Sequence, residues 1–314
     1  MKAGGNIIDL SIIIINYRTP TLTVRCIESI ANISTLNYEI IVIDNHSEDH
    51  STQYIRSKFQ TIQIIENYEN EGFGRANNLG ASIAKGQHLL FLNSDILIKN
   101  GTIEYCVNFL KTNSRIGAMG CQLRNEDGSI QKSTYTNVGK LKSILFRSIL
   151  ISYFFHERKS EIEGVMGAFF LMPAKIFHEV NGFDTDFFMY GEELELCQRL
   201  IKKGYSIVST TDVEAIHKHG GSSNGSDWGS KQNWLSTALL FYKTNGLGGY
   251  FIYHFFQIAV FLMNLSVLWK MNRNYRKGFW EESYYYFSNV RYYIAIPLNY
   301  SKKQNSGKNY LRRN

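Results

Sequence analysis

Leu10-Ser-Ile-Ile-Ile-Ile15 is an almost unbroken run of β-branched residues, and it ends in the polar sequence Asn16-Tyr17-Arg18-Thr19-Pro20. A strand without polar alternation is buried on both faces, which is typical of a parallel sheet. Residues 21–33 carry apolar side chains at helical spacing, and Glu39-Ile-Ile-Val-Ile43 repeats the buried-strand pattern. These strand–helix–strand units predict a doubly wound α/β sheet whose ligand crevice lies at the carboxyl ends of its strands.

The residues that directly follow these strands are candidates for ligand binding. Asn16 and Tyr17 follow the first strand, and Asp44 follows the second. Loops at this edge carry function more often than the core does. We therefore expect these three side chains to face the crevice.

The segment Gly72-Phe73-Gly74-Arg75 precedes a predicted helix that stops at Gly86. A Gly-x-Gly before a helix lets backbone N–H groups, and here Arg75, approach an anion such as a diphosphate. The third glycine of a dinucleotide fingerprint is missing. A tight turn that simply begins a helix is the alternative.

A fourth buried strand, residues 87–92, leads directly into Asn93-Ser94-Asp95. A carboxylate at the tip of a central strand is well placed to bind a divalent ion that carries a diphosphate. Oxygen ligands of this kind suit Mg²⁺ or Mn²⁺. The alternative is a turn aspartate that caps the following segment.

The segment from Gly182 to Cys197 combines an aromatic run with three carboxylates, Glu192, Glu193 and Glu195. The amphipathic pattern that follows predicts a helix with a basic last turn, so the glutamates lie at its N-terminus. A carboxylate held there can accept a proton from a substrate hydroxyl. Acidic residues also favour first helical turns without any function, and this remains the alternative.

His217 follows a predicted strand, residues 205–210, and lies beside two glycines. An imidazole at this position could complete a metal site with Asp95, although a lone histidine is more often structural. Between these motifs, the pattern predicts helices at 102–112 and 174–180 and strands at 116–123 and 164–173. The segment 135–163 has an apolar-basic pattern that fits either an ordinary amphipathic helix or one that touches an acceptor or a membrane.

Charge and cysteine content indicate a cytosolic-side protein that does not bind nucleic acid. Residues 270–314 hold ten Lys/Arg and two Glu, a net charge of +8, whereas the rest of the chain carries −1. Such a basic segment suits an anionic membrane surface. The four cysteines are far apart and lie among apolar residues, as reduced core thiols do. The N-terminus has no apolar run long enough for a signal peptide.

Six motifs occur in one order along residues 8–225, and together they resemble those of the family 2 glycosyltransferases. The branch they resemble most is the bacterial rhamnosyltransferase type of O-antigen, capsule and cell-wall assembly. The motifs are strand-Asn-Tyr, strand-Asp-Asn, Gly-Phe-Gly-Arg-Ala-Asn-Asn, Leu-Asn-Ser-Asp, Gly-Phe-Asp…Phe-Phe-Met-Tyr-Gly-Glu-Glu…Leu-Cys-Gln-Arg-Leu and His-x-x-Gly-Gly-Ser-Ser. The resemblance implies the GT-A fold, a Rossmann-like fold of nucleotide-diphospho-sugar transferases.

By this resemblance the first half of the chain would bind a nucleotide-sugar. Tyr17 would lie against the base, with the Ile15 and Asn16 backbone beside it. Asp44 would hold the base or the ribose, and Arg75 would lie near the nucleotide or its diphosphate.

The resemblance also implies a metal site and a general base. Asn93-Ser94-Asp95 stands at the Asp-x-Asp position of the family, so Asp95 would bind the metal together with His217. Glu193 stands where the family usually has Asp, which makes it the expected base, with Glu192 and Glu195 as rivals. The mechanism implied is a single displacement with inversion, assisted by Mg²⁺ or Mn²⁺. Asn93 replaces an aspartate, which leaves one carboxylate at the metal.

From about residue 231 the chain becomes aromatic and basic. Residues 250–269 are mostly apolar and long enough to cross a bilayer, but polar residues interrupt them. A helix in the membrane interface, a spanning helix and a helix packed on the catalytic domain are all open. We expect a catalytic domain at 1–230, with donor and acceptor halves at about 1–100 and 101–230, and a helical appendage at 231–314 on the cytoplasmic face of the membrane.

The expected function is transfer of a sugar, such as rhamnose, from a nucleotide-sugar to a glycan or lipid-linked acceptor of a bacterial surface polysaccharide. A nucleotidyltransferase is an alternative, although it would be expected to have a glycine-rich loop with Lys or Arg at the first strand. A non-catalytic nucleotide-binding or membrane scaffold protein is the other alternative, favoured by the altered residues Asn93 and Glu193.

Overall fold

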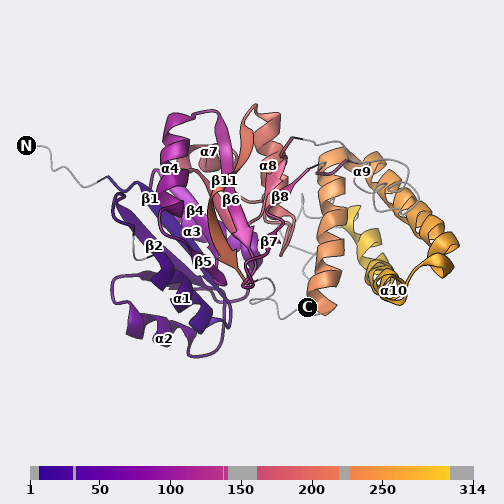
Figure 1. Ribbon diagram of the computed structural model, residues 1–314, viewed down its shortest axis with the longest axis horizontal. Coiled ribbons are helices and arrows are strands. Elements are labelled where there is room, and N and C mark those ends of the chain that lie inside the picture. The colour runs from indigo at the N-terminus through magenta and orange to yellow at the C-terminus, as the bar shows by residue number, and fades with distance from the viewer. Residues whose placement is uncertain (1–6, 31–32, 137, 141–160, 219–226, 298–314) are drawn as a thin grey trace, which may run out of the picture. The chain divides into compact units, whose positions relative to one another are not determined.

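The computed structural model describes residues 7–30, 33–136, 138–140, 161–218 and 227–297 (Figure 1). The chain divides into two compact units. The first comprises residues 1–135, 162–185 and 192–224, and the second comprises residues 136–161, 186–191 and 225–314. We call them the sheet unit and the helical unit.

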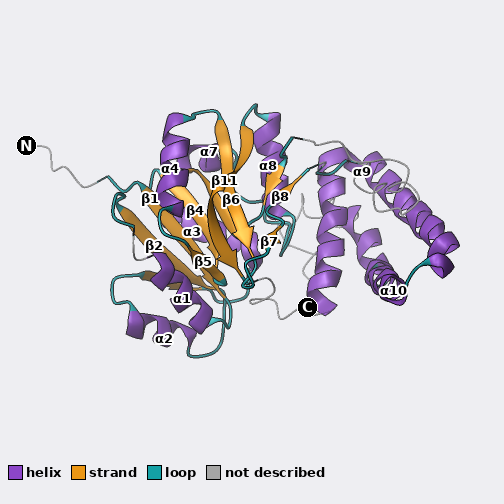
Figure 2. Ribbon diagram, in the orientation of Figure 1, coloured by secondary structure: helices purple, strands orange, loops and turns teal. Residues whose placement is uncertain are grey.

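The sheet unit alternates strands and helices along the chain (Figure 2). Its strands are β1 (Leu10–Asn16), β2 (Tyr38–Asp44), β3 (Gln63–Glu66), β4 (His88–Asn93), β5 (Ile96–Ile98), β6 (Ile116–Arg124), β7 (Ile130–Gln131), β8 (Thr134–Tyr135), β9 (Gly164–Val165), β10 (Phe169–Pro173) and β11 (Ser206–His217). Its helices are α1 (Pro20–Ile30), α2 (Ser51–Lys58), α3 (Gly72–Ile83), α4 (Thr102–Thr112), α7 (Ala174–Glu179) and α8 (Glu192–Lys202).

The main sheet has the strand order β3-β2-β1-β4-β10-β6-β11-β5, with β7 paired to β6. Strands β3, β2, β1 and β4 are parallel, so their carboxyl ends meet at one edge. Asn16 is level with Asp44, and Ile15 is level with Asn93. The predicted ligand-binding residues of three strands are therefore neighbours at this edge.

Two apolar layers cover the sheet. On one face, α1, α2 and α4 bury side chains such as Cys26, Ile55 and Val107 against the sheet. On the other face, α3, α7 and α8 contribute residues such as Ala76 and Leu196. The apolar runs predicted as buried strands are buried on both faces, as a covered sheet requires.

The sheet is parallel from β3 to β4 and mixed beyond β4. β10 runs antiparallel to both β4 and β6. The strand predicted at 205–210 continues as β11 to His217, with an irregularity in register between Thr210 and Glu214. Most of the segment 135–163, whose character was left open, lies outside the described residues.

The helical unit contains α9 (Asp227–Val267), the 3₁₀ turn η1 (Leu268–Lys270) and α10 (Arg273–Phe287). Gly246 interrupts α9 with non-helical dihedrals (φ 67°, ψ −169°), so two helices meet there. By length and composition, the segment from Trp228 to Lys270 is long and apolar enough to cross a membrane, and an 18-residue window within it has a mean hydropathy of 1.7. The division at residue 230 stays a prediction.

Candidate active site

The ends of β1 and β2 are joined by a buried polar network. The Asn16 side-chain amide donates to Asp44 Oδ1 (2.6 Å) and to Ser47 Oγ (3.1 Å). Asp44 also accepts hydrogen bonds from the Ser47 hydroxyl (2.5 Å) and from the Ser47 backbone N–H (3.0 Å). Both oxygens of Asp44 thus shape the loop after β2, which fixes the edge of the crevice.

Tyr17 and Arg18 extend this edge toward solvent. Tyr17 is exposed, and the Arg18 guanidinium lies 5.3 Å from the centre of its ring. Arg18 donates its backbone N–H to Ser47 Oγ (2.9 Å), and its own φ is 57°. Tyr17 thus presents an aromatic face with a cation beside it, and its expected contact with a nucleotide base stays a prediction.

The loop after β4 brings Asn93, Ser94 and Asp95 to the same edge. The Asn93 backbone N–H donates to Ala168 of the neighbouring chain segment (3.2 Å). The Ser94 and Thr19 hydroxyls are hydrogen-bonded at 3.0 Å, which ties this loop to the residues after β1. Asp95 is buried, and its backbone carbonyl accepts a hydrogen bond from the Lys218 N–H (3.0 Å).

His217, the last residue of β11, lies directly against this loop. Its Nε2 is 3.4 Å from Asp95 Oδ1 and 3.4 Å from the Asn93 amide nitrogen. Its Nδ1 is 2.7 Å from Gln131 Oε1. Because the amide nitrogen of Gln131 donates to Asn125 (2.8 Å), its oxygen faces the ring and accepts a hydrogen bond from the Nδ1–H group. The Nε2 lone pair is then directed toward Asp95 and Asn93.

The donor set fits a divalent ion that takes most of its ligands from elsewhere. Among the residues that the structure describes, no three His, Cys, Asp or Glu side chains gather as a complete metal site. Asp95 and His217 offer one carboxylate oxygen and one oriented imidazole nitrogen. A Mg²⁺ or Mn²⁺ ion with few protein ligands commonly completes its shell with waters and substrate phosphates. These two residues would hold such an ion.

Glu192 and Glu193 begin α8, where the helix dipole favours negative charge. A methyl group built on Gly167 would lie 3.8 Å from the Cβ of Glu193. Gly167 immediately precedes Ala168, the residue whose carbonyl accepts from Asn93. Glu193 therefore stands beside the chain segment that borders the Asn93–Asp95 loop, and not behind the opposite edge of the sheet.

The two glutamates have different environments. Glu192 is buried, and burial followed by the charge of Glu193 raises the pKa of its carboxyl well above 4.5. One of its oxygens has no hydrogen-bond partner among the described residues. Burial and the neighbouring carboxylate thus favour the protonated form of Glu192 over its charged form. A protonated carboxyl does not accept a proton, so Glu193 is the better candidate for a base.

Arg75 lies on the first turns of α3 and faces the segment that precedes α8. Its Nε donates to the Thr185 carbonyl (3.3 Å), and its guanidinium is 3.7 Å from Glu71. Gly74 allows this close approach, because a methyl group there would lie 3.2 Å from Phe183. The Gly-x-Gly pair is buried within the first turn of α3, so it packs this helix against the glutamate segment. The expected contact of Arg75 with a nucleotide stays a prediction.

Comparison of the sequence with models of known protein families identifies the family of this chain. Residues 11–180, more than half of the chain, match the model of Glycosyl transferase family 2. The chain is a family 2 glycosyltransferase. A second match, to the N-terminal domain of galactosyltransferase, covers residues 149–219.

Several curated proteins resemble this glycosyltransferase over two thirds of its length. The low-salt glycan biosynthesis hexosyltransferase Agl10 of Haloferax volcanii is 25% identical and is matched over 67% of each chain. The rhamnosyltransferase WbbL of Escherichia coli is 24% identical over 66% of this chain and 82% of its own. The N-acetylglucosaminyl-diphospho-decaprenol L-rhamnosyltransferase of Mycobacterium tuberculosis is 24% identical over 69% and 78%. They confirm the resemblance to the rhamnosyltransferase-type branch.

Solved structures confirm the GT-A fold. The mannosyltransferase PcManGT of Pyrobaculum calidifontis, in complex with GDP-Man and Mn²⁺, superposes with a TM-score of 0.61 over 96% of this chain and 88% of its own, at 14% identity. GalNAc-T7 with UDP, GalNAc and Mn²⁺ gives a TM-score of 0.55 over 76% and 50%, at 16% identity. Both of these structures contain Mn²⁺.

Sequence patterns overlooked three residues of the glycosyltransferase site. Ser47 had a local signal, because a side-chain oxygen three residues after Asp44 is typical of a tight polar turn. Gln131 lies on a two-residue strand and reaches His217 across 86 positions of the chain, which no local pattern reveals. Tyr135 is half-buried, and the loss of solvation and the charges of both glutamates raise the pKa of its hydroxyl. Its ring therefore helps to exclude water from them.

Proposed function

We propose that this enzyme transfers a sugar, with inversion, from a nucleotide-sugar to a glycan or lipid-linked acceptor of a bacterial surface polysaccharide. The observation that carries this proposal is the convergence of Asp95, His217 and Gln131 at the edge of the sheet where β1, β2 and β4 end. Glu193 supplies a carboxylate beside the same segment.

In the proposed reaction, the acceptor hydroxyl attacks the anomeric carbon while Glu193 takes its proton. The bond between that carbon and the diphosphate oxygen breaks, and the electron pair leaves with the nucleoside diphosphate. Asp95 and His217 would hold a divalent ion, whose positive charge would stabilise this leaving group. Tyr17 and Asp44 hold the nucleoside, and Arg75 lies near its phosphates.

Asp95 is the one carboxylate expected at the ion, because Asn93 stands where the family has a second aspartate. We therefore expect the ion to bind weakly when the donor is absent. Asn93 cannot supply the charge of an aspartate, and its amide instead faces His217. The diphosphate then becomes a principal ligand, so metal and donor bind together. We expect Mn²⁺ affinity to rise strongly when a nucleoside diphosphate is present.

Membrane association is part of the same proposal. The second half of α9 and the η1 turn after it expose an apolar face with a helical repeat, formed by Phe251, Phe255, Ile258, Leu262, Leu265 and Trp269. The opposite face buries Tyr253, Gln257 and Asn264 within the helical unit. One open apolar face, followed by Lys270, Arg273, Arg276 and Lys277, is typical of a helix in the interface of an anionic membrane. The proposed site of action is the cytoplasmic face of that membrane.

The test is donor turnover by the full chain with phosphatidylglycerol vesicles and a lipid-linked N-acetylglucosamine acceptor. The donors are dTDP-, UDP- and GDP-sugars, each with and without Mn²⁺. We begin with dTDP-rhamnose, because two of the relatives named above are rhamnosyltransferases. Metal-dependent transfer in which the product has the opposite anomeric configuration supports the proposal. Retained configuration, or equal turnover after metal removal, would overturn it.

A further inference from the structure

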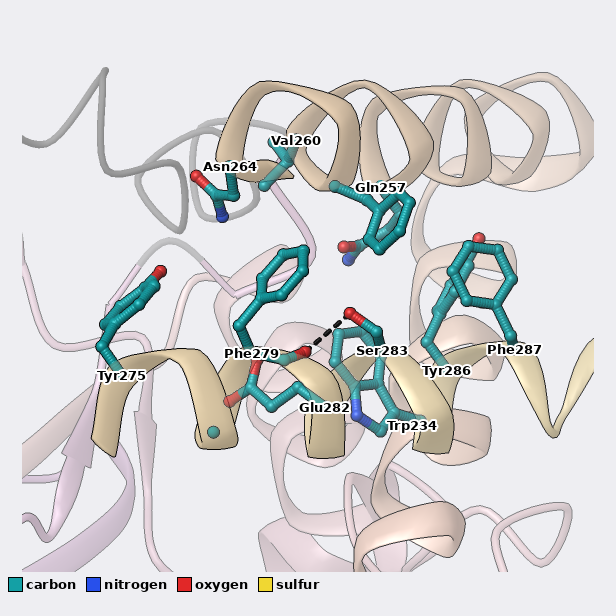
Figure 3. A pocket seen from close by; sticks show the side chains of 12 residues that line it. Trp234, Gln257, Val260, Asn264, Tyr275, Phe279, Glu282, Ser283, Tyr286 and Phe287 are labelled. Atoms are coloured by element: carbon teal, nitrogen blue, oxygen red, sulfur yellow. Dashed lines mark hydrogen bonds between the residues drawn. The ribbon is translucent and has the colours of Figure 1, made fainter. Parts of the chain in front are cut away.

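A cavity in the helical unit lies between α9 and α10 (Figure 3). Its volume is about 390 Å³, within the range of about 300–1,000 Å³ that is usual for small-molecule sites. It is lined by residues that include Trp234, Gln257, Phe261, Phe279, Glu282 and Ser283. None of the residues assigned to sugar transfer lies in its lining, so the cavity is separate from the candidate active site.

Aromatic rings form much of the wall. Phe261 of α9 and Phe279 of α10 are stacked, with ring centres 5.4 Å apart and an angle of 10° between the rings. Trp234 packs edge-on against Tyr286 at 5.4 Å. Flat aromatic surfaces of this kind offer a large contact area to the apolar face of a ring-shaped ligand.

Polar groups are directed into the same space. Gln257 is 7% exposed, and no hydrogen bond joins its amide to another group in the part of the chain that the structure describes. Figure 3 shows this amide pointing from α9 toward α10. Leaving a buried amide without a partner costs about 1–3 kcal/mol, so its position indicates a ligand or bound water that it contacts.

A carboxylate completes the polar set. Glu282 lines the cavity and forms no ion pair within the described ranges of the chain. Its charge contributes, after burial, to raising the pKa of Tyr275, another lining residue. The Ser283 hydroxyl donates to the Phe279 carbonyl (2.6 Å) and keeps a lone pair available as an acceptor.

These groups decide between two kinds of occupant. An alkyl chain would leave the buried Gln257 amide without a partner, which is unfavourable. A sugar ring presents an apolar face to the aromatic wall and hydroxyl groups to the amide and the carboxylate. We propose that this cavity is a carbohydrate-binding site that takes one sugar unit of the acceptor glycan. The inference that the ligand is a carbohydrate depends on the cavity alone. The inference that this carbohydrate is part of the acceptor rests on the proposed function.

The test uses fluorine NMR of the full chain labelled with 5-fluorotryptophan. The chain has four tryptophans, and Trp234→Phe assigns the signal of the residue in the cavity wall. Methyl glycosides of hexoses, 6-deoxyhexoses, N-acetylhexosamines and pentoses are titrated without any nucleotide-sugar. We expect at least one of them to shift the Trp234 signal saturably. Gln257→Leu should weaken that binding at least ten-fold, whereas Gln60→Leu, at an exposed glutamine, should not change it.

Two results would overturn the proposal. The first is the absence of any saturable shift, or a shift of equal affinity in Gln257→Leu and the parent. The second is a shift caused by monomeric dodecylphosphocholine but by no sugar, which would assign the cavity to an alkyl chain. The titration contains no donor, so it measures binding independently of sugar transfer. A chain that binds a methyl glycoside but transfers no sugar would support this site and contradict the proposed function. Sugar transfer by a chain whose Trp234 signal does not shift would contradict the carbohydrate site and leave the proposed function unaffected.

Discussion

Lys243 of α9 forms an ion pair with Asp186, and only 10% and 6% of the two side chains are exposed. Next to it, the Ser236 hydroxyl of α9 donates to the Met189 carbonyl (2.7 Å). Both contacts lie within the helical unit and fasten residues 186–191 to α9. Because Gly191 is followed directly by Glu192, this loop sets where the glutamate pair begins.

Replacing Lys243 by Met should lower both stability and turnover. Removing one partner of a buried ion pair costs about 3–5 kcal/mol, and a displaced loop would move Glu193. Urea denaturation and nucleoside diphosphate release measure the two effects. The control is Lys277→Met, because the Lys277–Glu281 pair is exposed (78% and 52%) and is worth at most about 1 kcal/mol. Equal losses in both variants would show that the Lys243 pair does not hold the loop.

Glu192→Gln should change how stability depends on pH. The pKa of Glu192 is raised above 4.5 in the folded chain, so above that pH the folded chain binds more protons than the unfolded chain. The free energy of unfolding therefore falls as pH rises, by at most about 1.4 kcal/mol per pH unit for this group. The glutamine variant loses this dependence and should be more stable than the parent at neutral pH.

Urea denaturation from about pH 4.5 to about pH 8 checks this difference. The control is Glu195→Gln, which removes one of the two oxygens that accept from Arg199 Nε (2.8 and 2.9 Å) together with the ion pair, and should reduce stability at neutral pH. The explanation for Glu192 fails if its variant is less stable than the parent throughout that range.

Gln131→Met should weaken metal binding, although Gln131 is not one of the proposed metal ligands. Its oxygen holds the Nδ1 proton of His217, and the loss of such a partner typically lowers metal affinity 10–100-fold. Electron paramagnetic resonance of Mn²⁺, titrated with a nucleoside diphosphate present, measures the affinity directly. Gln53→Met, at an exposed glutamine, serves as the control. Unchanged affinity in Gln131→Met would separate His217 from the metal.

The exposed face of α9 should determine binding to lipid. Placing an aspartate at Phe255 and at Leu262 removes two apolar side chains, each worth about 1.5–3 kcal/mol when fully buried. We expect sedimentation with phosphatidylglycerol vesicles to fall at least ten-fold. Tyr68→Asp, at a side chain that is 99% exposed in the sheet unit, should have no effect. If the chain with aspartate at Phe255 and Leu262 sediments like the parent, this face does not contact the membrane.

Local patterns predicted the elements that carry the site. The run in β1 has no polar alternation, and the glutamates of α8 stand before a clear amphipathic repeat, so both were placed correctly. Asn16, Asp44 and Asp95 were expected at one edge because parallel strands end together. The registers place Asn16 level with Asp44 and Ile15 level with Asn93, two residues before Asp95.

Pairing across the chain could not be predicted in the same way. β10 is as apolar as a parallel strand, so its sequence does not reveal that it runs antiparallel. The contact of Gln131 with His217 depends on β7 pairing with β6, which joins distant segments. Likewise, residues 250–269 suggested a membrane helix, whereas the cavity beside Gln257 exists only because α10 folds back onto α9.

The central claim is that Glu193, and not its neighbour Glu192, takes the proton of the acceptor hydroxyl. Nucleoside diphosphate release with Mn²⁺ and acceptor, measured for Glu193→Gln and Glu192→Gln, tests it most directly. Loss of a general base lowers turnover by about 10²–10⁴-fold, which we expect for Glu193→Gln with donor binding unchanged. Glu192→Gln resembles the protonated carboxyl and should stay within about ten-fold of the parent. Equal turnover by Glu193→Gln and the parent, or a larger loss in Glu192→Gln, would contradict the account.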